Sequence, residues 1–279
     1  MRVASLFVYP VKSARGISLE RARVLPTGIA GDRHFMIVGP DGGFVTQREE
    51  PCLARVAVAV DEARGMVTLT SGSTSVEVPC ASDPAAPHLV VTLWQDTLVA
   101  EDTGASVAEL LSLHAGRPLR LVRFGATASR PLALRYGDGH TTKLADGSPV
   151  LVATLASLAA LGSGQSRRAP PALTRFRANV VVDGIAPFEE ESASHLTLGE
   201  GPEAVVLRLV KPCPRCPVID VDPETGIREK GTLAALARTR PPRSAEEREE
   251  GEKRAVHFGV DAVVERPGIA HVGDLASFS

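Results

Sequence analysis

Residues 207–226, with the sequence LRLVKPCPRCPVIDVDPETG, decide which fold and which chemistry this chain can have. An apolar run typical of a β-strand leads into two cysteines, Cys213 and Cys216, with three prolines around them. Because proline fixes the backbone φ angle, a thiol in this segment can be held in one direction at little entropic cost. Four kinds of site use such a pair: a disulfide, half of a zinc site, a redox pair, or one thiolate ligand for a softer metal.

The composition limits the classes of partner and compartment. The chain has 279 residues, which suits one large domain or two of ordinary size, and its net charge of -2 gives no global field to hold nucleic acid or a membrane. Four cysteines are too few for a secreted disulfide scaffold. The first apolar run is too short for a signal peptide, and none approaches the roughly 20 residues of a membrane helix. We expect a cytoplasmic protein without nucleic-acid or membrane partners.

Short strands between turns dominate the pattern, so the sequence predicts a mainly β protein with some α. Apolar or alternating segments within residues 4–11, 33–47, 52–79 and 88–102 predict strands, and residues 66–78 form the clearest hairpin. Helices are predicted within 103–116, from Ser148 and Pro149 to Gly162, within 231–239 and, highly charged, within 244–254. A break near 116–125 predicts two domains, 1–118 and 119–279.

The sequence around the cysteine pair favours a reactive thiol over a zinc site and over a redox pair. A structural zinc site needs four ligands, but there is one C-x-x-C, and His195 and His257 lie in no finger-like spacing. A thioredoxin-like pair starts a helix, whereas Pro217 and VIDVD predict strand or loop here. Arg215 is expected to lower the thiol pKa of its neighbour Cys216, and thiolate selects soft or strongly covalent metals. Two inert cysteines in a loop remain an open alternative.

Three polar clusters flank predicted strands elsewhere in the chain. Arginine and lysine with serine or asparagine are the donors that hold a phosphate, provided that the clusters converge in space. Each cluster alone is more often a solvated strand end. The clusters are Lys12 with Ser13, Asp32 with Arg33, and Arg175 with Arg177 and Asn179.

Taken together, these motifs resemble the MOSC family, named for the C-terminal domain of molybdenum cofactor sulfurase. YPVKSARG, GDRHFMIV and VTQREEP look like its N-terminal β-barrel domain, while FRANVVVDG, KPCPRCPVIDVDPETG and FGVDAVVERPGIAHVGD resemble the MOSC domain. The resemblance runs from about Val3 to Asp274. It implies an N-terminal β-barrel-like domain, followed by a MOSC-type β-barrel domain with peripheral helices that carries the cysteine pair.

The resemblance also implies a cofactor and its ligands, because the chain is most similar to molybdenum enzymes of the amidoxime-reducing-component type. The implied cofactor is molybdenum-molybdopterin (Moco), not pyridoxal phosphate, with Cys216 as the metal ligand and catalytic residue. Pro214 stands where relatives often have a small hydroxyl residue, so a hydrogen bond from that position is lost. The implied cofactor-binding residues are Lys12, Ser13, Arg33, Arg177 and Asn179, with Asp146 and Ser148 lining the same site.

The implied activity is the reduction of N–O bonds in hydroxylamine- or amidoxime-like compounds. Some relatives continue into a ferredoxin-like domain, which we do not expect in this chain, so electrons are expected from a ferredoxin- or cytochrome b5-like protein and its reductase. The alternative is a carrier that holds the cofactor, or sulfur on Cys216, without turnover. A third alternative is a structural β protein. We further expect Asp32 to orient Arg33 and Trp94 to lie in the core.

Overall fold

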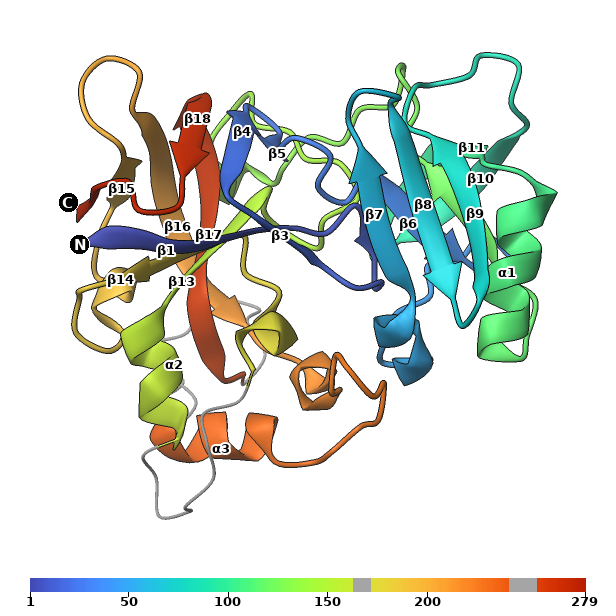
Figure 1. Cartoon of the computed structure of the whole chain (residues 1–279). Helices are drawn as coiled ribbons and strands as arrows, with labels where there is room; N and C mark the ends of the chain where they lie inside the picture. Colours follow the sequence, from blue (N-terminus) through green and yellow to red (C-terminus); the bar gives the residue numbers. More distant parts are fainter. Residues whose placement is uncertain (163–171, 241–254) are drawn as a thin grey trace.

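The computed structural model describes residues 1–162, 172–240 and 255–279, and it confirms a mainly β protein (Figure 1). Among these residues there are three helices, α1 (Ala105–Ala115), α2 (Leu155–Gly162) and α3 (Thr232–Thr239). The strands pair in four sheets.

The largest sheet has eight strands and combines the two ends of the sequence. Its order is β19-β15-β16-β17-β13-β14-β1-β3, antiparallel except for β13 and β14. Backbone hydrogen bonds from Val3 N to Asp274 O (2.9 Å) and Ala276 N to Met1 O (3.1 Å) connect β1 to the chain around β19, so the sheet curls on itself. A valine- and leucine-rich core lies inside. The strands are β1 (Arg2–Val8), β3 (Ile17–Leu19), β13 (Val150–Thr154), β14 (Val180–Asp183), β15 (His195–Leu198), β16 (Val205–Pro214), β17 (His257–Arg266) and β19 (Ala276–Phe278).

The remaining strands form three smaller sheets, one of which packs near the large sheet. That sheet has the order β18-β4-β5, and the other two have the orders β10-β11-β12-β6-β2 and β7-β8-β9. Their strands are β2 (Val11–Lys12), β4 (Arg21–Leu25), β5 (Gly28–Ile29), β6 (Phe35–Val38), β7 (Ala57–Asp61), β8 (Met66–Ser71), β9 (Thr74–Pro79), β10 (His88–Leu93), β11 (Asp96–Asp102), β12 (Arg120–Arg123) and β18 (Gly268–His271).

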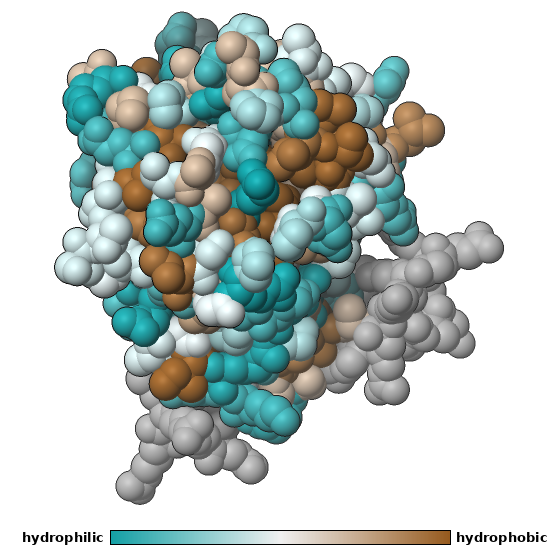
Figure 2. All heavy atoms as spheres, turned by 90° about the vertical axis from the view of Figure 1, so that its right-hand side faces the viewer, coloured by the Kyte–Doolittle hydropathy of each residue, from teal (hydrophilic) through white to brown (hydrophobic). Residues whose placement is uncertain are grey.

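The N-terminal sheets share a second core with α1, which packs against β8, β9 and β12. Val107, Leu110 and Leu111 are the buried face of this helix, and Gly116 ends it with a φ of 70°, a left-handed conformation that suits glycine. Figure 2 shows the side of the molecule that these sheets and α1 form, where hydrophilic side chains interrupt the apolar surface. The predicted hairpin at 66–78 is confirmed by β8 and β9.

Two predicted helices are confirmed, and one begins later than expected. The helices within 103–116 and 231–239 correspond to α1 and α3. A helix starting at Ser148 is wrong, because β13 (Val150–Thr154) precedes α2. These five residues are all buried, and β14 and β17 pair with β13 on its two sides, so the central position in the sheet determines the conformation. The predicted helix within 244–254 lies outside the described residues.

The sheets do not follow a simple division of the chain into two consecutive parts. β1 and β3 belong to the same sheet as strands from the second half, whereas β12 (Arg120–Arg123) belongs to an N-terminal sheet. The predicted division between residues 118 and 119 therefore separates β1 from its partner β14 (Val180–Asp183). As a statement about independent domains, that division stays a prediction.

Candidate functional site

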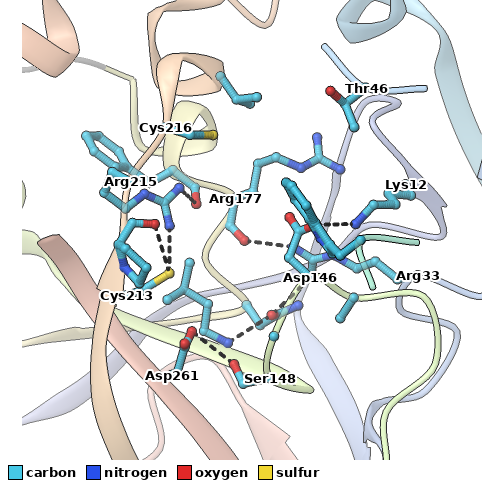
Figure 3. A pocket seen from close by; sticks show the side chains of 18 of the residues that line it. Lys12, Arg33, Thr46, Asp146, Ser148, Arg177, Cys213, Arg215, Cys216 and Asp261 are labelled. Atoms are coloured by element: carbon cyan, nitrogen blue, oxygen red, sulfur yellow. Dashed lines mark hydrogen bonds and ion pairs between the residues drawn. The ribbon is translucent and has the colours of Figure 1, made fainter. Parts of the chain in front are cut away.

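A cavity of about 480 Å³ brings all the predicted site residues together (Figure 3). They come from segments far apart in the chain: the end of β2, the turn before β6, the segments before β13 and β14, and the end of β16. We call this space the main cavity. The predicted residues in its lining are Lys12, Ser13, Arg33, Asp146, Ser148, Arg177, Asn179 and Cys216.

Backbone strain is concentrated at the main cavity. In the described part of the chain, five residues other than glycine have positive φ angles, and four of them line this cavity: Ser13 (74°), Arg33 (41°), Trp94 (59°) and Arg177 (56°). A left-handed conformation costs a non-glycine residue about 1–3 kcal/mol and persists only where surrounding contacts hold it. Such strain gathers where side chains must point in a direction that relaxed strands and turns do not provide.

Lys12 is held at the cavity wall by a carboxylate. Its Nζ donates to Asp146 Oδ1 at 2.6 Å and to the Leu144 carbonyl at 3.2 Å, and Trp94 Nε1 donates to the same Asp146 oxygen at 2.9 Å. Burial lowers the pKa of Lys12, while Asp146 opposes that shift. Desolvation favours the neutral acid at Asp146, but Lys12 and Trp94 together keep its pKa below the ordinary value. Lys12 and Asp146 therefore each favour the charged form of the other.

Trp94 corrects the expectation that it belongs to the core. Its side chain lines the main cavity, and the residue is 48% exposed. The Arg48 guanidinium lies 4.3 Å from the centre of its ring, and the ring also contacts Phe44. The indole is therefore part of the cavity wall, and its N–H helps to position Asp146.

Asp32 orients Arg33, as expected. Arg33 Nη1 donates to Asp32 Oδ2 at 2.6 Å and to Asn179 Oδ1 at 3.1 Å, while Asp32 Oδ1 accepts from Tyr9 N and Asn179 Nδ2. Desolvation acts to lower the pKa of Arg33, but the adjacent Asp32 carboxylate raises it overall. Asn179 also accepts from Leu151 N and donates to Phe7 O. Its amide is fully used, so Asn179 positions Arg33.

Arg177 has fewer hydrogen-bond partners than Lys12 and Arg33, the cations described above. Its Nη1 donates to the Ala14 carbonyl at 2.7 Å, and its guanidinium lies 4.3 Å from the centre of the Tyr9 ring. Its Nη2 is buried and has no hydrogen-bond partner in the described residues. Burial, followed by the nearby Arg33 charge, lowers the pKa of Arg177 to about 10. An anion next to this guanidinium would relieve both penalties.

The two cysteines have different surroundings, and this corrects one prediction. Arg215 Nη1 contacts Cys213 Sγ at 3.2 Å rather than the sulfur of its neighbour Cys216, whose Sγ lies 3.4 Å from Arg48 Nε. Burial, then the Asp261 charge, raises the pKa of Cys213 to about 12. Both thiols are free. Successive side chains of an extended segment point in different directions, so adjacency in sequence misassigned the arginine.

Asp261 is a second carboxylate of the cavity, and sequence reasoning missed it. It accepts from Ser148 Oγ at 3.0 Å and from the buried Tyr136 hydroxyl at 3.2 Å, and Lys211 Nζ lies 3.7 Å away. Figure 3 shows Asp261 beside Ser148, away from Cys216. A lone aspartate within the apolar run FGVDAVVE was the signal that could have identified it. Arg48, within the quoted motif VTQREEP, could likewise have been identified as a residue near the cysteines.

The charges and donors of the main cavity suit a large anionic ligand. Among the described residues, seven cationic side chains and two carboxylates line it. No group of three histidine, cysteine or acidic side chains that could bind a metal occurs in the described parts of the chain. A metal bound to Cys216 would therefore need ligands from a cofactor as well as from the protein. One thiol facing several fixed cations is the arrangement that such a cofactor would require.

The chain is similar to known families and proteins. Residues 1–118 match the family model for the MOSC N-terminal beta barrel domain, and residues 139–276 match that for the MOSC domain. The chain is 29% identical to mitochondrial amidoxime-reducing component 1 of Mus musculus and of Homo sapiens, covering 98% of this chain and 80% and 81% of theirs. It is 26% identical to molybdenum cofactor sulfurase of Bos taurus, over 92% of this chain but 30% of that protein.

None of the helices described here has the length and apolar character needed to cross a membrane.

Proposed function

This chain belongs to the MOSC family, and from that premise we propose that it is a molybdenum-cofactor-dependent oxidoreductase. Its proposed reaction is the reduction of N–O bonds in hydroxylamine- or amidoxime-like compounds. The relatives named amidoxime-reducing component support this reaction, since they align with nearly the whole chain. The relative named molybdenum cofactor sulfurase supports the cofactor class.

The observation that carries the proposal is the placement of Cys216 opposite the cations in one cavity. In Figure 3 Arg177 lies between Cys216 and the pair Lys12 and Arg33. The excess of cationic side chains over carboxylates fits a cofactor that carries a phosphate. Only a thiolate among these residues is a ligand that prefers a soft metal.

Each residue then has a distinct task. Cys216 would bind the metal, and Lys12, Ser13, Arg33 and Arg177 would bind the pterin and its phosphate. When bound, the cofactor supplies the two-electron and oxygen-atom chemistry. Asn179 holds Arg33, while Asp146 holds Lys12. Ser148 donates to Asp261 and lines the same cavity. The protein thereby contributes position and electrostatics rather than a nucleophile.

The stoichiometry of the reaction requires an external electron source. Reduction of R–NHOH to R–NH₂ and water consumes two electrons and two protons. We propose that a ferredoxin- or cytochrome b5-like protein and its reductase supply the electrons. Two of the relatives are named as mitochondrial proteins, so the expected cytoplasmic location stays a prediction.

The test measures metal content and turnover with the same protein. Protein from a host that makes the cofactor should contain about one molybdenum per chain, and protein from a cofactor-deficient host none. With a chemical reductant, the loaded protein should consume N-hydroxylated compounds above a Cys216→Ser blank. Near-zero molybdenum from both hosts would refute the proposal, and stoichiometric zinc would restore the structural-site alternative.

The carrier alternative has a different outcome in the same assay. Loaded protein that never exceeds the Cys216→Ser blank, yet transfers cofactor or sulfur to an acceptor apoenzyme, would identify a carrier. In that case the oxidoreductase assignment should be abandoned.

A further inference from the structure

A second, smaller cavity of about 90 Å³ lies behind Arg177. It shares Arg177 and Gln47 with the main cavity, but its other lining residues are different. Three arginines line it, Arg15, Arg175 and Arg177, against a single carboxylate, Glu224. We call it the arginine cavity. Its most exposed charged members are Arg15 and Glu224, whose side chains are 37% and 75% exposed, so it opens to solvent on their side.

Unpartnered hydrogen-bond donors gather at the arginine cavity. In the described residues, five buried side-chain nitrogen or oxygen atoms lack a partner, and three of them belong to its arginines. They are Arg15 Nε, Arg175 Nη1 and Arg177 Nη2. Buried donors without partners are rare in folded proteins, because each has lost its water without a replacement. Three on separate guanidinium groups around one space indicate that a ligand completes them.

The carboxylates nearby are already engaged with other nitrogens. Glu224 accepts from Arg15 Nη2 at 2.9 Å, and Asp222 accepts from Arg175 Nη2 at 2.6 Å. Asp222 is also fixed by the backbone N–H groups of Glu224 and Thr225. The Arg175 side chain is only 9% exposed, so its remaining N–H cannot turn to bulk water. Neither carboxylate can therefore satisfy the three free donors.

The size and chemistry of the space define the class of ligand. A cavity of about 90 Å³ has the volume of about three waters at roughly 30 Å³ each, which suits a tetrahedral oxyanion and is too small for a nucleotide. Three guanidinium groups exclude a metal cation. Their planar forks match the oxygens of phosphate or sulfate.

We propose that the arginine cavity is an oxyanion site for inorganic phosphate or sulfate, separate from the site in the main cavity. Bound there, the anion accepts from Arg15, Arg175 and Arg177. The same anion fixes the Arg177 guanidinium, which lines both cavities. This site does not depend on the proposed reductase activity, because it requires neither the cofactor nor the cysteines.

Calorimetric titration of full-length, cofactor-free protein with inorganic phosphate tests the site. We expect one phosphate per chain that depends on Arg15 and Arg175, and a second in the main cavity, which holds no cofactor in this preparation. Arg175→Gln and Arg15→Gln should each weaken binding roughly tenfold to hundredfold, as loss of a charge-assisted hydrogen bond predicts. Arg175→Lys, which keeps the charge near Asp222, should lose less than Arg175→Gln. Arg64→Gln is the matched control, because Arg64 forms an exposed ion pair with Glu77 and lines neither cavity.

Lys12→Ala separates the two cavities, since Lys12 lines only the main cavity. We expect phosphate to bind the arginine cavity of this variant as it binds that of the original protein. Equal weakening by Lys12→Ala and Arg175→Gln would place the anion in the main cavity and overturn the proposal. Absence of saturable phosphate binding would overturn it too.

A final titration uses cofactor-loaded protein. Continued binding of phosphate with unchanged affinity supports a separate site. If the bound cofactor excludes free phosphate, the arginine cavity belongs to the phosphate of the cofactor, and the separate oxyanion site is refuted. Circular dichroism of each variant establishes whether it is folded. If Arg175→Gln misfolds, Arg15→Gln still tests the site, because Arg15 is partly exposed.

Discussion

The two walls of the main cavity differ in how completely their side chains are held. On the cationic wall, formed by Lys12, Arg33 and Arg177, ion pairs or backbone carbonyls fix each side chain, and two of the three residues have left-handed backbones. On the cysteine wall, formed by Cys213 and Cys216, burial and polar neighbours hold one thiol protonated, while the other faces Arg48.

The two walls therefore have different functions: one binds an anion and the other provides a thiol. The cationic wall is organised before any ligand arrives, so little ordering cost remains when an anion binds. The cysteine wall distinguishes two thiols that are only three positions apart. A thiol with a pKa of about 12 is a poor metal ligand at neutral pH, because the thiolate is the form that binds. These contacts favour Cys216 over Cys213 for the ligand role that we propose, which stays a prediction.

The largest expected effect is the contrast between the two cysteine variants. Cys216→Ser should abolish molybdenum binding and N-hydroxylamine reduction, whereas Cys213→Ser should keep a substantial part of both, because only Cys216 is proposed as ligand. Metal analysis and the reductant-driven assay measure the two effects. Equal loss in both variants, together with a disulfide in the isolated protein, would show that the pair acts as a redox couple and that the two thiols are not distinct.

A smaller effect is expected on the cationic wall. Lys12→Ala or Arg33→Ala should weaken cofactor binding roughly tenfold to hundredfold, since each removes one charge-assisted hydrogen bond worth about 1.5–3 kcal/mol. Cofactor retained after gel filtration is the measurement, with exposed Arg64→Ala as the control. Full occupancy in both site variants would indicate that this wall does not contact the cofactor.

The protonation of Cys213 can be tested directly by alkylation at pH 8. Relative to the same thiol in urea, we expect labelling slower by roughly thirtyfold to sixtyfold. A pKa near 12 lowers the thiolate fraction about a thousandfold, and the greater nucleophilicity of a more basic thiolate offsets part of this. Mass spectrometry of the peptide carrying Cys213 gives the rate. If Cys213 were labelled as fast in the native protein as in urea, the proposed difference between Cys213 and Cys216 would be wrong.

The raised pKa of Cys213 also makes the free energy of unfolding depend on pH. Because folding raises the pKa of Cys213, its contribution to the free energy of unfolding is complete below the ordinary thiol pKa. The contribution is lost as the pH rises from there toward about 12.

The smallest effect is expected for Trp94→Phe. This variant keeps an aromatic ring near Arg48 but loses the N–H that donates to Asp146. A net contribution of about 0.5–1.5 kcal/mol predicts a roughly twofold to tenfold loss of cofactor affinity. Retention of cofactor is measured as for Lys12→Ala. A loss as large as that for Lys12→Ala would mean that the indole itself contacts the ligand.

The sequence predicted the composition of the site better than its internal contacts. Strand-end motifs and the family resemblance identified eight residues that line one cavity, because such motifs place polar side chains at the ends of strands. Nearest neighbours in sequence did not predict that Arg215 contacts Cys213 or that Arg48, 168 positions from Cys216, contacts Cys216. These pairs depend on how separate segments meet, which no local pattern records.

The fold shows the same limit. Turn residues and alternating hydrophobicity located most strands, and Gly116 marked the end of α1. The start of α2 was misplaced because an apolar run of five residues fits a buried strand or a helix, and only the neighbouring β14 and β17 decide between them. The position of Trp94 was missed because a lone tryptophan in a hairpin sequence carries no signal of its orientation.

The pairing of β1 with β14 has a consequence for biosynthesis. The first strand emerges from the ribosome early, yet its partner, Val180–Asp183, is made more than 170 residues later. At roughly 5–20 residues per second, the edge of β1 that pairs with β14 stays unpaired for on the order of ten seconds or more, although β3 can pair with the other edge early. During that interval the hairpins β7–β9 and β10–β11 can already form from local sequence. The nascent chain therefore presents an apolar strand that chaperones would be expected to cover.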